Sequence, residues 1–197
     1  MVKVLTAGHN LIELDAFADG SRRELNVIVE TPRGSRNKFD YDERLGLFKL
    51  GGVLPAGASF PFDFGFVPST LGGDGDPLDV LVLMDEPAFA GCLVRTRLVG
   101  VVEAEQTERD GETTRNDRLI GVAADSRLHT RVRTLESLGP TLLEEIEHFF
   151  VSYNQAKGKE FKPRGRFGPA HALRLVEEGV RQFKKSKGKR AAKKSRA

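Results

Sequence analysis

Short apolar stretches run through the first two thirds of the chain and predict β-strands. Some of them alternate with polar residues: Val27 and Val29 point to one face of their segment, and phenylalanine recurs at every second position from Phe60 to Phe66. Others are continuous apolar runs, as expected for strands buried on both faces. The predicted strands are 25–30, 60–66, 79–84, 93–104 and 119–124. Five short strands joined by glycine-rich turns favour a small barrel.

The last third of the chain predicts two helices. Pro140 and Pro169 each precede a run with helical spacing, and proline is favoured in the first turn of a helix. Tyr153 lies at the end of the first apolar stripe, where its hydroxyl can reach the edge of a cleft. The apolar positions are Leu142, Leu143, Ile146, Phe149 and Phe150 in the first helix, and Ala170, Leu173, Val176, Val180 and Phe183 in the second. Strands followed by helices predict an α+β fold.

Composition limits the class of protein. The chain has 197 residues, of which 39% are hydrophobic and 30% charged, which is typical of one globular domain. The single cysteine, Cys92, excludes a disulfide framework and a cysteine-based zinc site, and it favours a reducing compartment. No apolar run approaches the ~20 residues of a membrane span, and residues 1–20 do not resemble a signal peptide. We therefore expect a cytoplasmic protein without a membrane partner.

The charge is unevenly distributed along the chain. The net charge is +3, but eight lysines and arginines and no acidic residue lie in 184–197, which leaves 23 basic and 28 acidic residues elsewhere. A block of like charges usually stays solvated and disordered. We therefore predict one folded domain over 1–183 and a basic, disordered tail over 184–197. The tail either solubilises the protein or contacts a polyanion weakly.

The most informative segment is a cluster of three carboxylates. Asp74, Asp76 and Asp79 fall within six residues, among glycines and one proline, directly before an apolar run. Carboxylates this close disfavour one another's ionisation, and a hard divalent cation such as Mg²⁺ relieves that cost. The spacing does not fit an EF-hand, because Leu78 replaces a ligand and no glutamate closes the loop. A simple acidic turn into a strand remains the alternative on spacing alone.

The same segment carries a family resemblance. Asp74-Gly-Asp-Pro-Leu-Asp79 followed by Val-Leu-Val resembles the signature of the soluble family I inorganic pyrophosphatases. Further motifs of that family occur in the same order from about Leu25 to Ala172. They are Val29-Glu-Thr-Pro-Arg-Gly-Ser-Arg-Asn-Lys-Phe-Asp-Tyr-Asp42, Phe60-Pro-Phe-Asp-Phe-Gly-Phe66, His148-Phe-Phe-Val-Ser-Tyr153 and Lys157-Gly-Lys159.

The resemblance implies a fold, a reaction and a set of site residues. The expected fold is a small closed OB-like β-barrel with two C-terminal helices packed outside and the active site at its mouth. The expected reaction is Mg²⁺-dependent hydrolysis of pyrophosphate, and prokaryotic members usually form hexamers. Asp76 is similar to the residue that helps to deprotonate the attacking water. The implied metal ligands and acidic cavity residues are Asp74, Asp79, Glu30 and Asp40, and the implied phosphate-binding residues are Lys38, Arg118 and Tyr153.

Several positions depart from the family pattern. Gly52 stands where an arginine is expected, Phe64 replaces a tyrosine, Asn116 an aspartate and Asn154 a lysine. Arg118 replaces a lysine and keeps its charge. In a loop about four residues longer than usual, Gln106 matches another expected aspartate. Possible stand-ins nearby are Arg44 and Lys49 for Gly52, Asp117 for Asn116 if the register slips by one, and Glu105, Glu108, Asp110 and Glu112 for Gln106.

Three hypotheses follow. The first is a pyrophosphatase that is slow for its family, because losing one preorganised donor costs about 10²–10³ in rate. The second is a pyrophosphatase-fold protein with lost or altered activity, which binds phosphorylated ligands or hydrolyses another phosphoanhydride. The third is a polyanion-binding module acting through the tail. The acidic body disfavours this last hypothesis.

Overall fold

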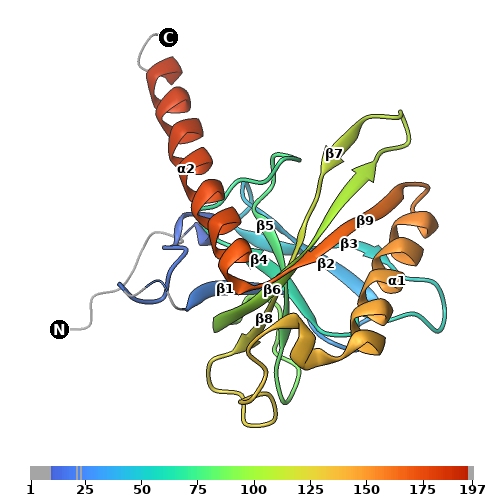
Figure 1. The fold of residues 1–197 in the computed structure, drawn as a ribbon. Helices are drawn as coiled ribbons and strands as arrows, with labels where there is room; N and C mark the ends of the chain where they lie inside the picture. Colours follow the sequence, from blue (N-terminus) through green and yellow to red (C-terminus); the bar gives the residue numbers. More distant parts are fainter. Residues whose placement is uncertain (1–9, 21, 23, 195–197) are drawn as a thin grey trace.

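Five strands form a closed barrel. The structure is a computed structural model that describes residues 10–20, 22 and 24–194. Around the ring each strand pairs with the next, and the last pairs with the first; only β5 and β8 are parallel. In ring order the strands are β1 (Leu25–Thr31), β4 (Asp63–Val67), β5 (Leu78–Leu83), β8 (Arg118–Ala123) and β6 (Leu93–Thr107). The predicted α+β fold with a small closed barrel is confirmed (Figure 1).

The sequence pattern placed one of these strands too early. The strand predicted over 60–66 begins only at Asp63, and Phe60 lies in the preceding bend. Phe60 nevertheless packs against Phe64, with ring centroids 5.5 Å apart. The periodic phenylalanines therefore reflect packing in the core more than the length of the strand.

Four further strands lie outside the ring. The hairpin of β2 (Asn37–Asp42) and β3 (Leu47–Val53) forms a small sheet of its own. The strands β7 (Thr113–Arg115) and β9 (Glu160–Phe167) both pair with the long β6 and extend the main sheet. Two short 3₁₀ helices, η1 (Leu11–Glu13) and η2 (Leu135–Leu138), complete the described elements.

Both predicted helices are present outside the barrel. Helix α1 (Pro140–Ala156) lies beside β9, and α2 (Pro169–Lys194) packs along β6 with Ala172 and Val176 buried (Figure 1). The predicted disorder of residues 184–197 in solution stays a prediction, although the structure describes residues up to Lys194 as helix. Helix α2 continues without a break to Lys194 and projects beyond the body, whereas residues 195–197 lie outside the described part. The pattern of charge did not reveal that the chain is already helical where the tail begins.

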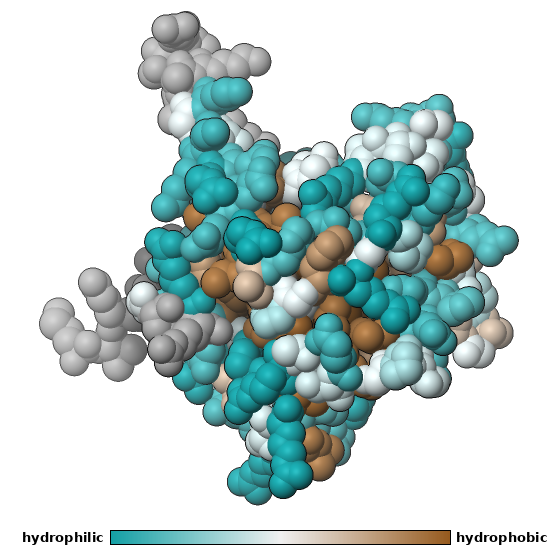
Figure 2. All heavy atoms as spheres, viewed as in Figure 1, coloured by the Kyte–Doolittle hydropathy of each residue, from teal (hydrophilic) through white to brown (hydrophobic). Residues whose placement is uncertain are grey.

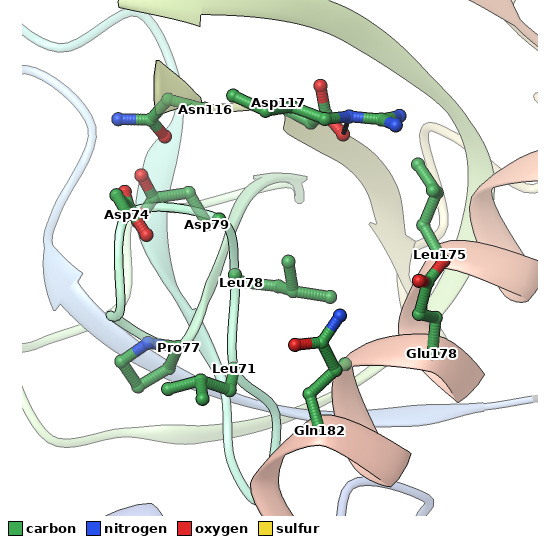
Figure 3. Close-up of a pocket in the computed structure, with 14 residues that line it drawn as sticks. Leu71, Asp74, Pro77, Leu78, Asp79, Asn116, Asp117, Leu175, Glu178 and Gln182 are labelled. Carbon is green, nitrogen blue, oxygen red and sulfur yellow. Dashed lines mark hydrogen bonds and ion pairs between the residues drawn. The ribbon is translucent and has the colours of Figure 1, made fainter. Parts of the chain in front are cut away.

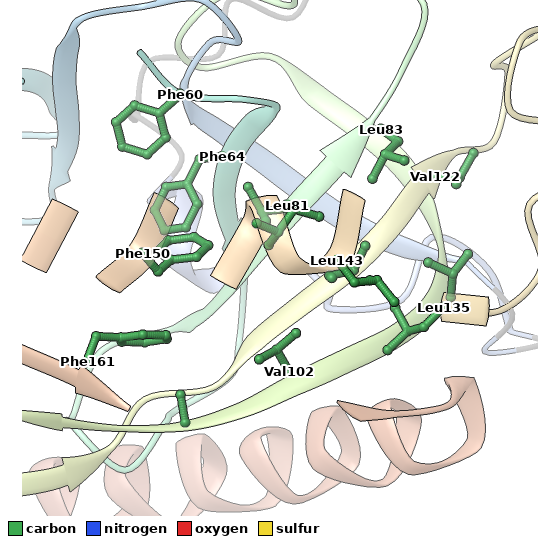
Figure 4. Close-up of a cluster of buried hydrophobic side chains, with 14 of the residues drawn as sticks. Phe60, Phe64, Leu81, Leu83, Val102, Val122, Leu135, Leu143, Phe150 and Phe161 are labelled. Carbon is green, nitrogen blue, oxygen red and sulfur yellow. The ribbon is translucent and has the colours of Figure 1, made fainter. Parts of the chain in front are cut away.

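The core consists of two clusters that meet at β5. Leu81 and Leu83 face the cluster that receives α1, and Val80 and Val82 face the cluster that receives α2. This double burial explains why β5 reads as an uninterrupted apolar run. In the first cluster the rings of Phe60, Phe64, Phe150 and Phe161 lie in a row from the bend before β4 to β9 (Figure 4).

The face of the molecule seen in Figure 2 is largely polar. Hydrophilic residues cover most of the face in Figure 2, and hydrophobic residues reach the surface mainly near its centre. No helix in the described residues carries an apolar stretch long enough to cross a bilayer.

Candidate active site

A buried lysine gathers two carboxylates at the start of the β2–β3 hairpin. The Nζ atom of Lys38 lies 3.1 Å from Oε2 of Glu30 on β1 and 2.7 Å from Oδ1 of Asp40. The other oxygen of Glu30 accepts a hydrogen bond of 2.7 Å from the backbone N–H of Tyr41. A Cβ on Gly51 would lie 1.5 Å from Oδ2 of Asp40, so glycine at this position makes room for the carboxylate.

The loop before β5 holds its aspartates in a tight turn. Gly75 has a φ of +90°, which favours glycine, and the backbone N–H of Gly72 donates to the carbonyl of Asp76 at 2.7 Å. Oδ1 of Asp74 accepts a hydrogen bond of 3.1 Å from the backbone N–H of Asp76. The side chains of Asp74 and Asp76 are exposed, whereas Asp79 is half-buried at the start of β5.

The second buried cation binds the third aspartate. Nη1 of Arg118 donates to Oδ2 of Asp79 at 2.6 Å. The guanidinium also lies 4.8 Å from the ring centroid of Phe150, a cation–π distance. Its Nε is buried and has no hydrogen-bond partner in the described part of the chain.

The two cations lie near one aromatic ring. The ring centroid of Phe64 lies 5.1 Å from Nζ of Lys38 and 5.9 Å from the guanidinium carbon of Arg118. The ring of Tyr153, from the last turns of α1, packs 5.6 Å from that of Phe60, and its hydroxyl accepts a hydrogen bond from Lys157. The predicted phosphate-binding residues therefore come together around the site.

Burial and crowding shift the pKa values of this group. Desolvation raises the pKa of Glu30, and it raises the pKa of Asp79 to about 6 although Arg118 opposes the shift. Desolvation also raises the pKa of Asp76, and the charges of Asp74 and Asp40 add to the effect.

The basic and phenolic groups are shifted as well. Burial works against the charged form of Lys38, but Glu30 and Asp40 outweigh it and its pKa is raised. Burial raises the pKa of Tyr153 to about 12, which keeps its hydroxyl protonated as a hydrogen-bond donor. Lys38 is thus held in its charged form, whereas burial and crowding disfavour the ionised form of the carboxylates.

The donor set fits a hard divalent cation in its chemistry. All the acidic groups offer oxygen, and the raised pKa values of Asp76, Asp79 and Glu30 express the crowding and desolvation that a bound cation offsets. In the described residues no three acidic or histidine side chains already converge as a formed metal cluster. The reason is visible in the ion pairs, because Lys38 and Arg118 stand between the carboxylates.

The register of the β7–β8 turn has not slipped. Asn116 contacts Arg118 through its Oδ1 and donates to Oε1 of Gln106 at 3.3 Å. Asp117 instead accepts hydrogen bonds from the backbone N–H of Ala104 and from Nε of Arg115. Figure 3 shows Asn116 with Asp74 and Asp79 on one side of a pocket and the carboxylate of Asp117 apart from them. The position beside Arg118 is therefore held by a neutral amide.

The acidic stand-ins near Gln106 are engaged elsewhere. Glu105 pairs with Arg164, and Oδ1 of Asp110 accepts from the backbone N–H of Glu112 within the hairpin turn. Only Glu108 contacts Gln106, at 2.7 Å, and it also pairs with Lys159.

Asn154, which stands where the family pattern has a lysine, has a structural role in this chain. Asn154 is buried, and its Nδ2 donates to the carbonyl of Phe150 one turn earlier at 2.9 Å. It offers no cation to the site.

The neighbourhood of Gly52 differs from what the sequence suggested. Gly52 lies opposite Lys38 in the hairpin and lines a cavity of about 340 Å³. Lys49 pairs with Asp42 at 3.0 Å, and neither it nor Arg44 lines this cavity. Two cations that received no role from the sequence do line it, Arg36 and Lys157. Spatial proximity was needed to find them, since they lie 16 and 105 positions from Gly52 along the chain.

The fold and site together define a class. A closed barrel presents a loop of aspartates beside buried basic groups and a protonated tyrosine, which suits a divalent cation and a phosphate-bearing anion. Sequence comparison specifies the class further: the family described as "Inorganic pyrophosphatase" matches residues 27–184. The chain belongs to the inorganic pyrophosphatase family, which uses a divalent metal cofactor.

Individual relatives agree with this assignment. The inorganic pyrophosphatase of Synechocystis is 38% identical over 160 residues, which cover 81% of this chain and 92% of that protein. The Thermus thermophilus enzyme is 37% identical over 169 residues, which cover 84% and 94% of the two chains. A crystal structure of the inorganic pyrophosphatase from Thermus thermophilus superposes with a TM-score of 0.80 over 89% of this chain and 99% of that one, at 36% identity.

Proposed function

We propose that this chain hydrolyses inorganic pyrophosphate to two phosphate ions and that the reaction depends on Mg²⁺. The observation that carries the proposal is the placement of Lys38 and Arg118 near one aromatic ring, next to the aspartate loop. A highly charged phosphoanhydride needs cationic groups at separate positions together with carboxylates for its metal ions. The site supplies both.

The carboxylates divide between metal binding and proton transfer. Asp74 and Asp79, with Glu30 and Asp40 across the site, are the side chains that would hold Mg²⁺. Bound Mg²⁺ polarises phosphoryl oxygens and lowers the pKa of coordinated water. Asp76 accepts the proton of the attacking water, and its exposed carboxylate at the loop tip is accessible for this role.

The remaining groups bind and orient the substrate. Lys38, Arg118 and Tyr153 donate hydrogen bonds to phosphate oxygens. Lys38 and Arg118 are paired with carboxylates in this structure, so each must exchange a carboxylate for a phosphate oxygen when substrate binds. The exchange is reasonable because the same carboxylates are the proposed metal ligands.

The departures from the family argue for a slow enzyme. The ring of Phe64 cannot donate a hydrogen bond, Gly52 supplies no cation, and Asn116 places a neutral amide beside Arg118. They also favour a second candidate function. The cavity beside Gly52 leaves room for a larger phosphorylated ligand, so binding such a ligand or hydrolysing another phosphoanhydride is the alternative.

The setting of the protein is also part of the proposal. By resemblance to prokaryotic members of the family we expect a homo-oligomer, a hexamer, in the cytoplasm. The basic extension of α2 is expected to add weak contact with polyanions. Light scattering coupled to size-exclusion chromatography measures the oligomer directly.

One assay tests the function. Phosphate release is measured with pyrophosphate, tripolyphosphate and nucleotides, with Mg²⁺ and with a chelator. Release from pyrophosphate that requires Mg²⁺ supports the proposal, and activity that survives chelation contradicts the metal requirement. No release from pyrophosphate with any divalent metal favours the second function.

A further inference from the structure

The cavity beside Gly52 is open where the family pattern has an arginine side chain. No atom lies within 4 Å of the position a Cβ would take on Gly52, and the backbone there is not in the left-handed region. Lys38 and Tyr153, both placed at the substrate, line the same cavity. Any cation that reaches this space therefore stands next to the substrate.

Lys157 reaches this space without a carboxylate partner. Its Nζ donates a hydrogen bond to the hydroxyl of Tyr153 and lies 4.3 Å from that ring's centroid. No ion pair of Lys157 occurs in the described part of the chain, although its side chain is half-buried. Burial lowers the pKa of Lys157, and the charges of Asp40 and Glu108, neither of which forms an ion pair with it in the described residues, offset this only in part. A partly desolvated ammonium without a carboxylate is suited to binding an anion.

The position of Lys157 is fixed by the hairpin that is longer than the family's. Arg109, near the tip of the β6–β7 hairpin, donates to the carbonyl of Lys157 from Nε at 2.8 Å and from Nη2 at 2.6 Å. Beside it, Glu108 pairs with Lys159 at 2.7 Å. These contacts tie the turn after α1 to the hairpin, so the backbone that carries Lys157 is held in place.

Arg36 also lines the cavity. Its Nε donates to the carbonyl of Leu54 at 2.9 Å, which anchors the side chain and leaves the two terminal amino groups of the guanidinium for another acceptor. Arg36 and Lys157 thus border the space at Gly52 together with the buried Lys38.

We propose that Lys157, assisted by Arg36, takes over the phosphate-binding position that Gly52 leaves vacant, and that it holds terminal oxygens of pyrophosphate. The inference rests on the proposed function for the identity of its ligand. It explains how a chain without an arginine at position 52 keeps three cations around the substrate, namely Lys38, Arg118 and Lys157. The third cation then extends from the end of α1 instead of from β3. The bond to the hydroxyl of Tyr153 then links the replacement to a residue already assigned to phosphate.

The test combines a loss with a rescue. Lys157→Met removes the charge and keeps the aliphatic stem that packs on Tyr153, and Gly52→Arg returns a cation from the other side. Binding of methylenediphosphonate, a pyrophosphate analogue that cannot be hydrolysed, is measured by calorimetry with Mg²⁺ present, and KM and kcat for pyrophosphate are measured in parallel. The matched control is Lys162→Met, since Lys162 is exposed on β9 and does not line the cavity.

We expect Lys157→Met to weaken analogue binding about tenfold, the usual effect of losing one charge-assisted hydrogen bond, and to raise KM more than it lowers kcat. Adding Gly52→Arg to Lys157→Met should restore most of that affinity, whereas Lys162→Met should bind like the parent. A Lys157→Met variant that binds like the parent overturns the inference. A loss that Gly52→Arg does not reduce also overturns it, because Lys157 would then act at a different place.

The outcome is separable from that of the proposed function. Analogue binding that depends on Lys157 without any phosphate release would refute hydrolysis and support the binding position. Efficient pyrophosphate hydrolysis that Lys157→Met leaves unchanged would refute the binding position and support hydrolysis.

Discussion

Nη1 of Arg118 lies 2.6 Å from Oδ2 of Asp79, so the most buried cation of the site is bound to a carboxylate assigned to metal binding. Because the side chain of Arg118 is 5% exposed and that of Asp79 24%, removing the arginine leaves a poorly solvated negative charge. We expect Arg118→Met to lower the free energy of unfolding by about 2 kcal/mol in the absence of metal, below the full cost of breaking a buried pair. Chemical denaturation measures it.

A second variant separates this charge effect from lost packing. Adding Asp79→Asn to Arg118→Met removes the unpaired charge and should recover part of the stability. Mg²⁺ should raise the melting temperature of Arg118→Met more than that of the parent, because Asp79 is then free to bind it. Equal stability of the single and double variants would contradict the charge explanation.

Asp76 is predicted to accept a proton without holding the fold together. Its side chain is exposed, and in the described residues only its backbone takes part in the hydrogen bonds of the loop. We expect Asp76→Asn to lower kcat by about 10²-fold or more, the usual contribution of a general base, while the melting temperature changes little. Asp125→Asn, at an exposed position outside the site, is the control. Near-full activity of Asp76→Asn would refute the assigned role.

Asp63 offers a test of pH dependence away from the carboxylates that we propose as metal ligands. It is 1% exposed; its Oδ1 accepts from the backbone N–H of Ala88 at 3.0 Å, and its Oδ2 has no partner in the described part of the chain. Desolvation raises its pKa above the ordinary value of 3.8. The folded protein therefore binds this proton more tightly than the unfolded chain, so ionising Asp63 costs stability as the pH rises through that interval.

Asp63→Asn should remove this cost. We expect the variant to gain in melting temperature relative to the parent when both are compared at about pH 8, and to gain less or lose at about pH 4, where more of the parent carboxyl is protonated. Calorimetric scans of the two proteins across that range provide the measurement. A difference that is independent of pH would show that the carboxyl does not titrate differently in the folded state.

The basic end of α2 is expected to contribute to binding more than to stability. Lys187 pairs with Glu13 at 2.7 Å, but both side chains are about half exposed, and such surface pairs contribute about 1 kcal/mol or less. Deleting 184–197 should therefore shift the melting temperature by only a few degrees. It should also reduce the salt concentration needed to elute the protein from heparin. A large loss of stability would show that this part of the helix supports the body.

The barrel strands that could be predicted are those buried on one or both faces. β5 and β8 form continuous apolar runs, and in β1 the apolar residues are buried while Asn26 and Glu30 are half-buried, so their patterns match their surroundings. β9 was missed because every second residue is basic: Lys162, Arg164 and Arg166. Two of these side chains pair with carboxylates at the surface, Arg164 with Glu105 and Arg166 with Glu147. A polar sequence of this kind predicts a loop, and the ion pairs that support a strand are visible only in the structure.

The site divides in the same way. The aspartate cluster stands out from its spacing within a few positions, whereas the residues around Lys38 were indicated only by the family resemblance of their motif. The cavity at Gly52 could not be predicted, because it depends on Arg36 and on Lys157, which meet only through the fold. The sequence shows that the expected arginine is missing at Gly52, and the structure shows which side chains lie beside that position.

Restoring the family residues tests whether this is a pyrophosphatase site that has lost some of its substrate- and metal-binding groups. Gly52→Arg meets no backbone strain and an open cavity, so the substitution itself should be tolerated. Phe64→Tyr adds a hydroxyl to a ring whose centroid lies 5.1 Å from Nζ of Lys38 and 5.9 Å from the guanidinium carbon of Arg118, so cationic donors are near. Asn116→Asp places a carboxylate beside Arg118 and Asp79, so its benefit should appear only when Mg²⁺ is present.

We expect the triple variant to raise kcat/KM for pyrophosphate at least about tenfold, which corresponds to about 1.4 kcal/mol of barrier and is modest against the usual contribution of one donor. Because Lys157 already serves the space at Gly52, the arginine should contribute less in the parent background than when Lys157 is replaced by methionine. Asn116→Asp and Phe64→Tyr should then account for most of the gain, and the individual variants measure their shares. A triple variant that folds, binds Mg²⁺ and still gains nothing on pyrophosphate would show that the site has been adapted to another phosphorylated substrate, and assays with tripolyphosphate and nucleotides would take precedence.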